Sequence, residues 1–229
     1  MENPFPKSTS AAEKVKRLFS TVGQDDTVAV LINADPDALS SALALKRMFW
    51  RKVKKTSIFR INTVKRADNL AMVKLLKIDH QHIRKLNSSD FTRWAIVDSQ
   101  PHHNPQLGKY RYDIIIDHHP PGPGVKAPYM DIKEESGATA TLMIEYLRAA
   151  KIRPSPRLAT ALFYGIKTDT ENFARPTTEG DIKAFRYLYP FVNSHIIKKI
   201  GSSEFTKKSL DSFREALERY VIIRNRAFV

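Results

Sequence analysis

Short apolar runs rich in branched side chains alternate with longer segments of helical periodicity along most of the chain. A short branched run indicates a strand, whereas apolar positions that recur every three or four residues indicate a helix. The strands predicted in this way span residues 27–32, 57–61, 94–97 and 114–116. The predicted helices span residues 37–51, 67–76, 138–150, 158–163 and 181–189. Strands that alternate with helices predict an α/β fold, in which helices cover both faces of a parallel sheet.

The two ends of the chain differ from this alternating region. Near the start, Ser8–Ser10 can cap a first helix. From Asp181 onward only helical patterns occur, and the last predicted helix spans residues 206–224. We therefore expect one domain over residues 1–190, followed over residues 191–229 by a helical segment or linker.

Composition narrows the classes of function. The chain has 229 residues and no cysteine, so a metal ion could be bound only by oxygen and imidazole ligands. The net charge of +14, from 38 basic and 24 acidic residues, attracts polyanions such as nucleotides or nucleic acids. The basic run KRMFWRKVKK, residues 46–55, is either part of such a surface or the solvated end of a helix. No apolar run approaches the roughly 20 residues that span a membrane, so we expect a soluble, cytoplasmic protein without a membrane partner.

Three of the predicted strands end in acidic or imidazole side chains. These are Asp35 and Asp37 after the first strand, Asp98 after the third, and Asp117, His118 and His119 at the end of the fourth. The carboxyl ends of parallel strands meet at one edge of a sheet, where ligands bind. Carboxylates brought together there repel one another unless a cation neutralises them, and imidazoles suit transition metals. The pattern therefore predicts a metal site.

Each segment also has a purely structural interpretation when it is taken alone. Asp35, followed by Pro36, could cap a helix, and Asp98 could be a turn residue. Asp169, in the segment YGIKTDTENF, could also be a cap. The metal site is favoured by the occurrence of all these segments in one chain and in this order.

Four segments together resemble a known superfamily. NADPDALSSALAL, VDSQP, IDHHP and GIKTDTENF, which lie between residues 28 and 173, resemble motifs I to IV of the DHH phosphoesterases. That superfamily includes RecJ-type exonucleases, oligoribonucleases that also dephosphorylate adenosine bisphosphate, cyclic-dinucleotide phosphodiesterases and manganese-dependent pyrophosphatases. SGATATLMIEYL, residues 136–147, makes the likeness strongest to the oligoribonuclease branch. The resemblance implies a Rossmann-like DHH domain that hydrolyses phosphate esters of nucleotides or short oligonucleotides.

The resemblance also implies a site with two Mn²⁺ ions, for which Mg²⁺ or Co²⁺ could substitute. The implied ligands of the metals are Asp35, Asp37, Asp98, His118 and Asp169. Asp98 would bridge the two ions and, with His119, act in catalysis. His119 would face the phosphate, and Asp117 would orient a histidine from behind. Two such cations activate water and neutralise the charge of a phosphate under attack.

Two positions depart from the family pattern. Leu31 stands where many members have a histidine, and Asn33 stands where RecJ-like members have an aspartate, so the first metal would be held weakly. The alternative function is a nucleotide-binding or regulatory module that has lost turnover. We expect Leu31 to pack against the following helix, Asn33 to offer only a neutral oxygen, and His102 and His103 to lie on the surface.

The family pattern also bears on the end of the chain and on assembly. Members of this kind carry a small substrate-binding domain with a glycine-rich motif after the catalytic domain. No such motif occurs in this sequence. We expect that the domain was removed from this chain, and the alternative is a naturally short member of the family. A homodimer is compatible with the sequence.

Overall fold

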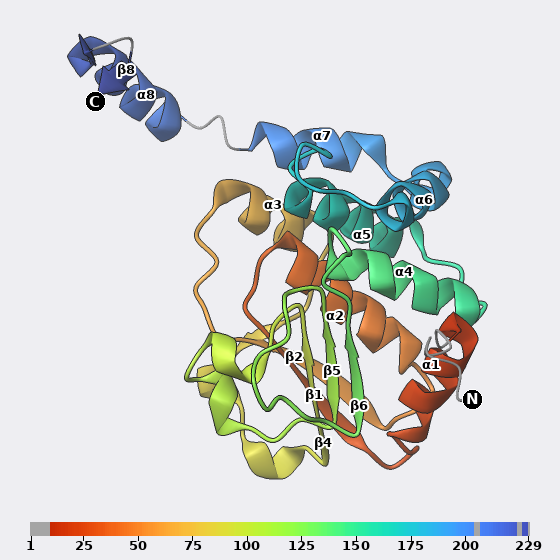
Figure 1. Cartoon of the computed structure of the whole chain (residues 1–229). Coiled ribbons are helices and arrows are strands. Elements are labelled where there is room, and N and C mark those ends of the chain that lie inside the picture. The colour runs from red at the N-terminus through yellow and green to blue at the C-terminus, as the bar shows by residue number, and fades with distance from the viewer. Residues whose placement is uncertain (1–9, 204–206, 224–225, 229) are drawn as a thin grey trace, which may run out of the picture.

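A six-stranded parallel sheet forms the centre of the protein (Figure 1). The computed structural model describes residues 10–203, 207–223 and 226–228. The strand order is β3-β2-β1-β4-β5-β6, and all neighbours are parallel. The strands are β1 (Thr27–Ile32), β2 (Lys55–Arg60), β3 (Gln81–His82), β4 (Arg93–Val97), β5 (Ile114–Asp117) and β6 (Tyr129–Ile132). The predicted α/β fold with a parallel sheet is confirmed.

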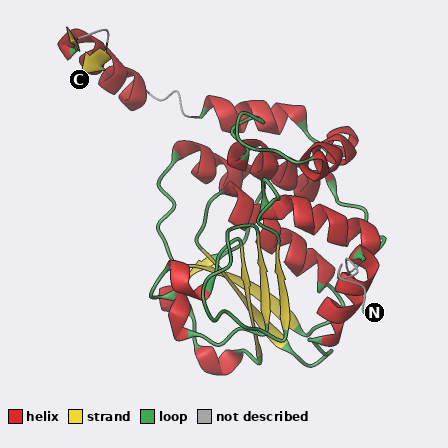
Figure 2. Cartoon of the chain, viewed as in Figure 1, coloured by secondary structure: helices red, strands yellow, loops and turns green. Residues whose placement is uncertain are grey.

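Seven α-helices of the described chain pack on one face of this sheet, so the prediction that helices cover both faces was wrong. They are α1 (Ala11–Ser20), α2 (Pro36–Met48), α3 (Ala67–Leu75), α4 (Thr139–Ala149), α5 (Pro156–Asp169), α6 (Glu179–Leu188) and α7 (Ser194–Ser202). Their buried side chains form the main core with Val28, Val30 and Ile32 of β1. The opposite face carries a smaller core, covered by loops and by the 3₁₀ helices Ile83–Lys85, Ser88–Asp90 and Leu107–Lys109 (Figure 2).

Leu31 belongs to the smaller core. Its side chain is fully buried beside Phe59, Ile96 and Ile115, because alternate residues of a strand point to opposite faces of a sheet. The expectation that it packs against the following helix was therefore wrong. Helix α2 lies on the other face, against Val30.

Several elements differ in length from the sequence prediction. β3 and β6 were not predicted, because both are short edge strands, and Met130 of β6 is exposed. α5 is longer than residues 158–163 since Ser155 caps it at Leu158 and its polar last turn continues to Asp169. Such a turn lacks the apolar periodicity by which the helix was recognised.

The C-terminal part also differs in detail. Helix α8 (Lys207–Arg219) is followed by the antiparallel strands β7 (Val221–Ile223) and β8 (Arg226–Phe228). The helix predicted over residues 206–224 therefore ends early, and its two end residues lie outside the described part. Ile200 of α7 is buried in the main core, and the division at residue 190 stays a prediction. Among the described residues, no helix has the length and apolar character needed to span a membrane.

Candidate metal centre

The strand order places the candidate residues at the topological switch point of the sheet, where successive strands are added on opposite sides of β1. β1 has β2 on one side and β4 on the other, although β4 comes much later in the chain. A crevice forms at such a point outside the carboxyl ends of the two strands. Asp35 follows β1 and Asp98 follows β4. The topology therefore brings two distant segments of the sequence to one crevice.

Asp37 is held by the N-terminus of another helix. Its two carboxylate oxygens accept backbone N–H groups of Thr139 at 2.6 Å and of Ala140 at 2.8 Å, the first residues of α4. A helix N-terminus binds negative charge because its amides lack partners within the helix. Ser41 adds a weaker hydrogen bond at 3.3 Å. The carboxylate is therefore fixed in position although it is almost completely buried.

Asp98 is fixed by its backbone as well as its side chain. Its φ angle is +58°, a left-handed conformation that few residues other than glycine adopt. Its N–H donates to Ile116 of β5 at 2.9 Å, and the hydroxyl of Thr139 donates to its carboxylate at 2.8 Å. Such conformations are concentrated at functional sites. Here the turn directs a buried carboxylate toward the ring of His118, 3.5 Å away.

His118 has one nitrogen anchored and one nitrogen facing acids. Nδ1 donates to the carbonyl of Ser136 at 3.0 Å, so the neutral ring has its lone pair on Nε2. Nε2 lies 3.1 Å from Asp169 and 3.5 Å from Asp98, yet it is buried without a hydrogen-bond partner among the described residues. A lone pair that faces two carboxylates is unfavourable unless a proton or a metal cation lies between them. These donors therefore fit a divalent metal.

His119 is oriented by the fully buried Asp117. Its Nδ1 donates to Asp117 at 2.8 Å, and nearly half of the ring is exposed. The amide of Gln100 holds the other oxygen of Asp117 at 2.8 Å and also donates to the carbonyls of His119 and Pro120. Its oxygen accepts from the N–H of Gly122 at 2.9 Å. Gln100 thereby fixes both the carboxylate and the loop after β5.

Asp169 reaches the site from the last turn of α5. This helix passes very close to the start of α2, because Gly165 has no side chain. A Cβ at that position would lie 2.5 Å from the hydroxyl of Ser40 and 3.2 Å from the backbone at Pro36 and Asp37. The close approach brings the ligand atoms of Asp37, His118 and Asp169 within 4.8 Å of one another.

Two other groups of this kind occur among the described residues. One consists of Asp98, His118 and His119, and the other of His103, Asp117 and His119. His103 is exposed, but its Nδ1 contacts the hydroxyl of Ser99 and the N–H of Gln100, each at 3.2 Å. His102 is likewise exposed.

The predicted ligands of the first metal are placed differently. Asp35 caps α2, accepting the N–H of Ala38 at 2.9 Å, and belongs to none of these groups in the described part of the chain. Asp35 and Asp169 nevertheless line the same cavity of about 570 Å³. Asn33 is exposed and has no hydrogen bond with the described residues. The cap interpretation of Asp35 therefore holds, and it does not preclude a second role at the cavity.

The pKa shifts report an excess of negative charge. Burial, with the neighbouring Asp169, raises the pKa of Asp37 to about 7. Burial and the charges of Asp37 and Asp35 raise the pKa of Asp98 well above its usual range. Burial would lower the pKa of His118, but the contact with Asp169 and the charge of Asp37 raise it to about 9. A divalent cation would relieve the same imbalance.

Three residues of the site were not singled out from the sequence. Gln100 lies in the quoted segment VDSQP and Thr139 in SGATAT, but neither type of side chain suggested contact with an aspartate far away in sequence. Asn62 uses its amide to hold the N–H and the carbonyl of Ala34 at 2.8 and 2.9 Å, just before Asp35. The only signal for Gln100 and Thr139 was their position within a quoted segment, and Asn62 lies in none of these segments.

Comparison with protein families decides the classification. A model described as "DHH family, N-terminal domain" matches residues 27–166, which is more than half of the chain. The chain belongs to the DHH family. The resemblance found in the four motifs is thereby confirmed. DHH family members are metal-dependent phosphohydrolases.

Individual DHH relatives extend this result. The chain is 33% identical over 193 residues to the uncharacterized protein MJ1633 of Methanocaldococcus jannaschii, covering 84% of this chain and 40% of that protein. It is 25% identical over 187 residues to a protein of Deinococcus radiodurans named as a probable manganese-dependent inorganic pyrophosphatase, covering 78% and 57%. The chain thus spans about half the length of these two relatives.

A solved structure shows the same fold. An exopolyphosphatase-related protein from Bacteroides fragilis superposes with a TM-score of 0.71 and 16% sequence identity. The superposition covers 96% of this chain and 68% of the other.

Proposed function

We propose that this chain is the catalytic part of a manganese-dependent phosphoesterase that hydrolyses phosphate esters of nucleotides or short oligonucleotides. The main support is the Nε2 atom of His118, which is buried between Asp98 and Asp169 without a hydrogen bond to any described residue. Manganese is supported by the name of the Deinococcus radiodurans relative. Mg²⁺ and Co²⁺ remain in the proposal as substitutes.

One ion would be held by Asp37, Asp98, His118 and Asp169, and a second by Asp98 and Asp35. Bound ions would supply activated water and neutralise phosphate charge. Neither Leu31 nor Asn33 adds a charged or imidazole ligand, which supports weaker binding of the ion at Asp35, the first metal of the family pattern. His119 would contact the phosphate, because its pKa is raised, mainly by the hydrogen bond to Asp117, and its ring is half-exposed.

The cavity beside the carboxylates supports an anionic substrate. Besides Asp35 and Asp169, its charged lining consists of the cations Arg66, Lys167 and Arg175 and the acids Asp68 and Glu171. Arg66 binds Asp68, and Arg175 pairs with Glu171 at 2.5 Å.

Lys167 forms no ion pair with a described residue, and its ammonium lies 6.0 Å from the ring of Tyr164. A lysine beside these carboxylates could bind the phosphate of an ester while the carboxylates hold the metal ion.

A manganese titration of the metal-free chain tests the proposal. We expect binding that raises the melting temperature, together with hydrolysis of a generic phosphodiester. Asp98→Asn should remove most of both effects, because Asp98 would serve both ions. Asp79→Asn is the matched control, since its side chain is 86% exposed and pairs only with Lys46 in the described part. An unchanged manganese response in Asp98→Asn would refute the role of Asp98.

The same titration distinguishes the proposed hydrolase from the alternative function. A nucleotide-binding module without turnover would be stabilised by nucleotide but would hydrolyse nothing. Short RNA, adenosine bisphosphate, a cyclic dinucleotide and pyrophosphate, each with manganese, form the substrate panel. Hydrolysis of pyrophosphate alone would contradict the proposed substrate class.

A further inference from the structure

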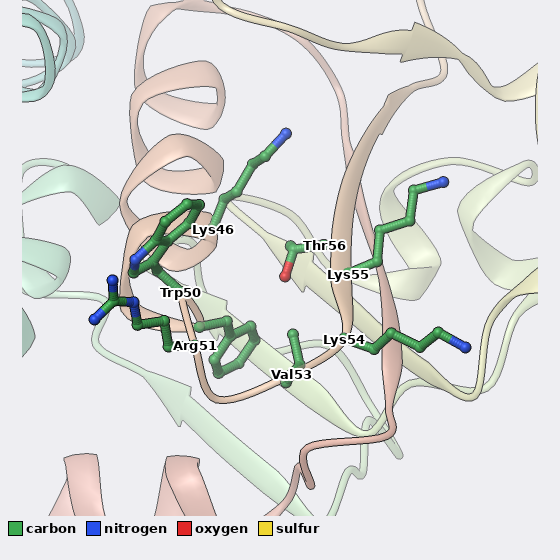
Figure 3. Close-up of a pocket in the computed structure, with 8 residues that line it drawn as sticks. Lys46, Trp50, Arg51, Val53, Lys54, Lys55 and Thr56 are labelled. Atoms are coloured by element: carbon green, nitrogen blue, oxygen red, sulfur yellow. The ribbon is translucent and has the colours of Figure 1, made fainter.

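A second cationic pocket lies at the opposite end of α2 from the metal centre. It has a volume of about 270 Å³ and is formed where α2 ends and β2 begins (Figure 3). Asp37 lies in the first turn of α2 and Trp50 just beyond its last turn, so about 20 Å of helix separates them at 1.5 Å per residue. The pocket therefore belongs to neither the carboxylate cluster nor its cavity.

The lining combines an exposed aromatic ring with cations. Trp50 is 66% exposed, although tryptophan is usually well buried. The lining residues are Lys46, Phe49, Trp50, Arg51, Val53, Lys54, Lys55 and Thr56. Four of them are basic and none is acidic. Trp50 and Arg51 lie on one side and Lys54 and Lys55 on the other, with the hydroxyl of Thr56 between them (Figure 3).

Neighbouring acids leave most of these cations unneutralised. Asp79 pairs with Lys46 at 3.6 Å. The carboxylate of Asp26 is engaged by Thr92, Gly23 and Arg93, and only its backbone carbonyl meets the N–H groups of residues 54 and 55. Within the described part of the chain, the side chains of Arg51, Lys54 and Lys55 form no ion pair. The surface is therefore suited to an anion with several charges.

We propose that this pocket binds single-stranded nucleic acid, with one base stacked on Trp50 and the flanking phosphates on Lys54, Lys55 and Arg51. Sites that hold single strands combine a basic groove with aromatic rings on which bases stack. A duplex is disfavoured, because its bases are already stacked on one another.

The two tryptophans of the chain make the test direct. Trp94 is partly buried and stacked on Tyr110, with ring centroids 4.6 Å apart. In Trp94→Phe the only indole is that of Trp50, so stacking of a base should quench the remaining fluorescence. The titration uses an RNA strand of about ten nucleotides in the presence of a chelator. Binding is then independent of the metal centre, and Asp98→Asn should bind equally well.

Two substitutions give quantitative expectations. Trp50→Ala, followed by the anisotropy of a dye-labelled strand because the Trp50 signal is lost, should weaken binding roughly 5- to 150-fold, the effect of one lost stacking contact. Lys54→Ala should reduce the slope of log affinity against log salt concentration by about 0.7, the value for one phosphate contact on a single strand. Lys85→Ala is the control, because this substitution removes the same charge from an exposed position outside the pocket. It should leave the slope unchanged.

Three outcomes would overturn the inference. One is unchanged affinity in Trp50→Ala, and another is equal affinity for heparin, which carries charge but no bases. The third is a response of Trp50 fluorescence only to phosphatidylserine vesicles and not to RNA, which would assign the pocket to a membrane surface. Because metal is absent throughout, a failed hydrolysis assay leaves this test unaffected.

Discussion

Asp117 is fully buried, yet its pKa is held below the ordinary value. Burial alone would raise it, but hydrogen bonds from His119 and Gln100 stabilise the charged form more strongly. The ionised carboxylate in turn raises the pKa of His119. Asp117 therefore acts at the site through the ring it holds.

Replacing Asp117 with asparagine tests this coupling. Asp117→Asn keeps the shape of the side chain but removes its charge, so the pKa of His119 should fall. Proton NMR of the imidazole C–H signals in the metal-free protein measures the shift. Asp79→Asn should leave the His119 titration where it is. A raised pKa that survives in Asp117→Asn would show that another group is responsible.

At the scale of elements, the site depends on how closely α5 approaches α2. Asp169 lies one turn beyond Gly165, where the two helices are closest. Three consecutive residues after α5, at positions 171–173, have positive φ angles between 47° and 66° although none is glycine. Helix contact and strained turn together fix the direction of the last turn of α5.

Gly165→Ala should separate these helices. The added Cβ meets backbone atoms of α2 that cannot rotate away, so we expect a loss of about 1–3 kcal/mol in the free energy of unfolding. Manganese binding should weaken as Asp169 moves from Asp37. Urea unfolding and calorimetric titration measure the two effects. Gly201→Ala is the control for the effect on unfolding, because it also adds a methyl group to a helix but nothing lies within 4 Å of that Cβ. Unchanged manganese affinity in Gly165→Ala would show that metal binding does not depend on the contact between α5 and α2.

At the scale of the molecule, a basic protein surrounds an acidic centre. The net charge of +14 attracts polyanions at long range, while the carboxylates at the crevice repel them at short range. Protons or a bound metal cation in the centre would neutralise the carboxylates and so remove this repulsion. Metal, proton and substrate binding should therefore be linked.

This linkage predicts how stability depends on pH. The folded-state pKa values of Asp37, about 7, and His118, about 9, exceed their unfolded values of about 3.9 and about 6.5. Both groups hold more protons in the folded state, so their stabilising contribution is present at low pH. It is lost as pH rises, between about 4 and about 7 for Asp37 and between about 6.5 and about 9 for His118.

Manganese must displace these protons. Its stabilising effect should therefore be larger at about pH 8 than at about pH 6. Melting temperatures with manganese and with chelator at each pH measure the difference, and Asp98→Asn should abolish it. An equal manganese effect at both pH values would contradict the linkage.

The sequence by itself determined the parallel α/β fold, the DHH family and which segments carry acids and imidazoles. Periodicity is a local property, and the four motifs place their acids at strand and helix ends whatever surrounds them. The sequence did not reveal the roles of Gln100 and Thr139, because their partners Asp117 and Asp98 lie 17 and 41 residues away.

Only the tertiary structure decided which nitrogen of His118 faces the acids and on which face of the sheet Leu31 is buried. It also decided that Trp50 stays exposed among lysines, whereas the sequence favoured interpreting this basic run as only the solvated end of a helix. These properties depend on the order of the strands and on the distance between helices. Both are set by packing between segments that are remote in sequence, and no local pattern contains them.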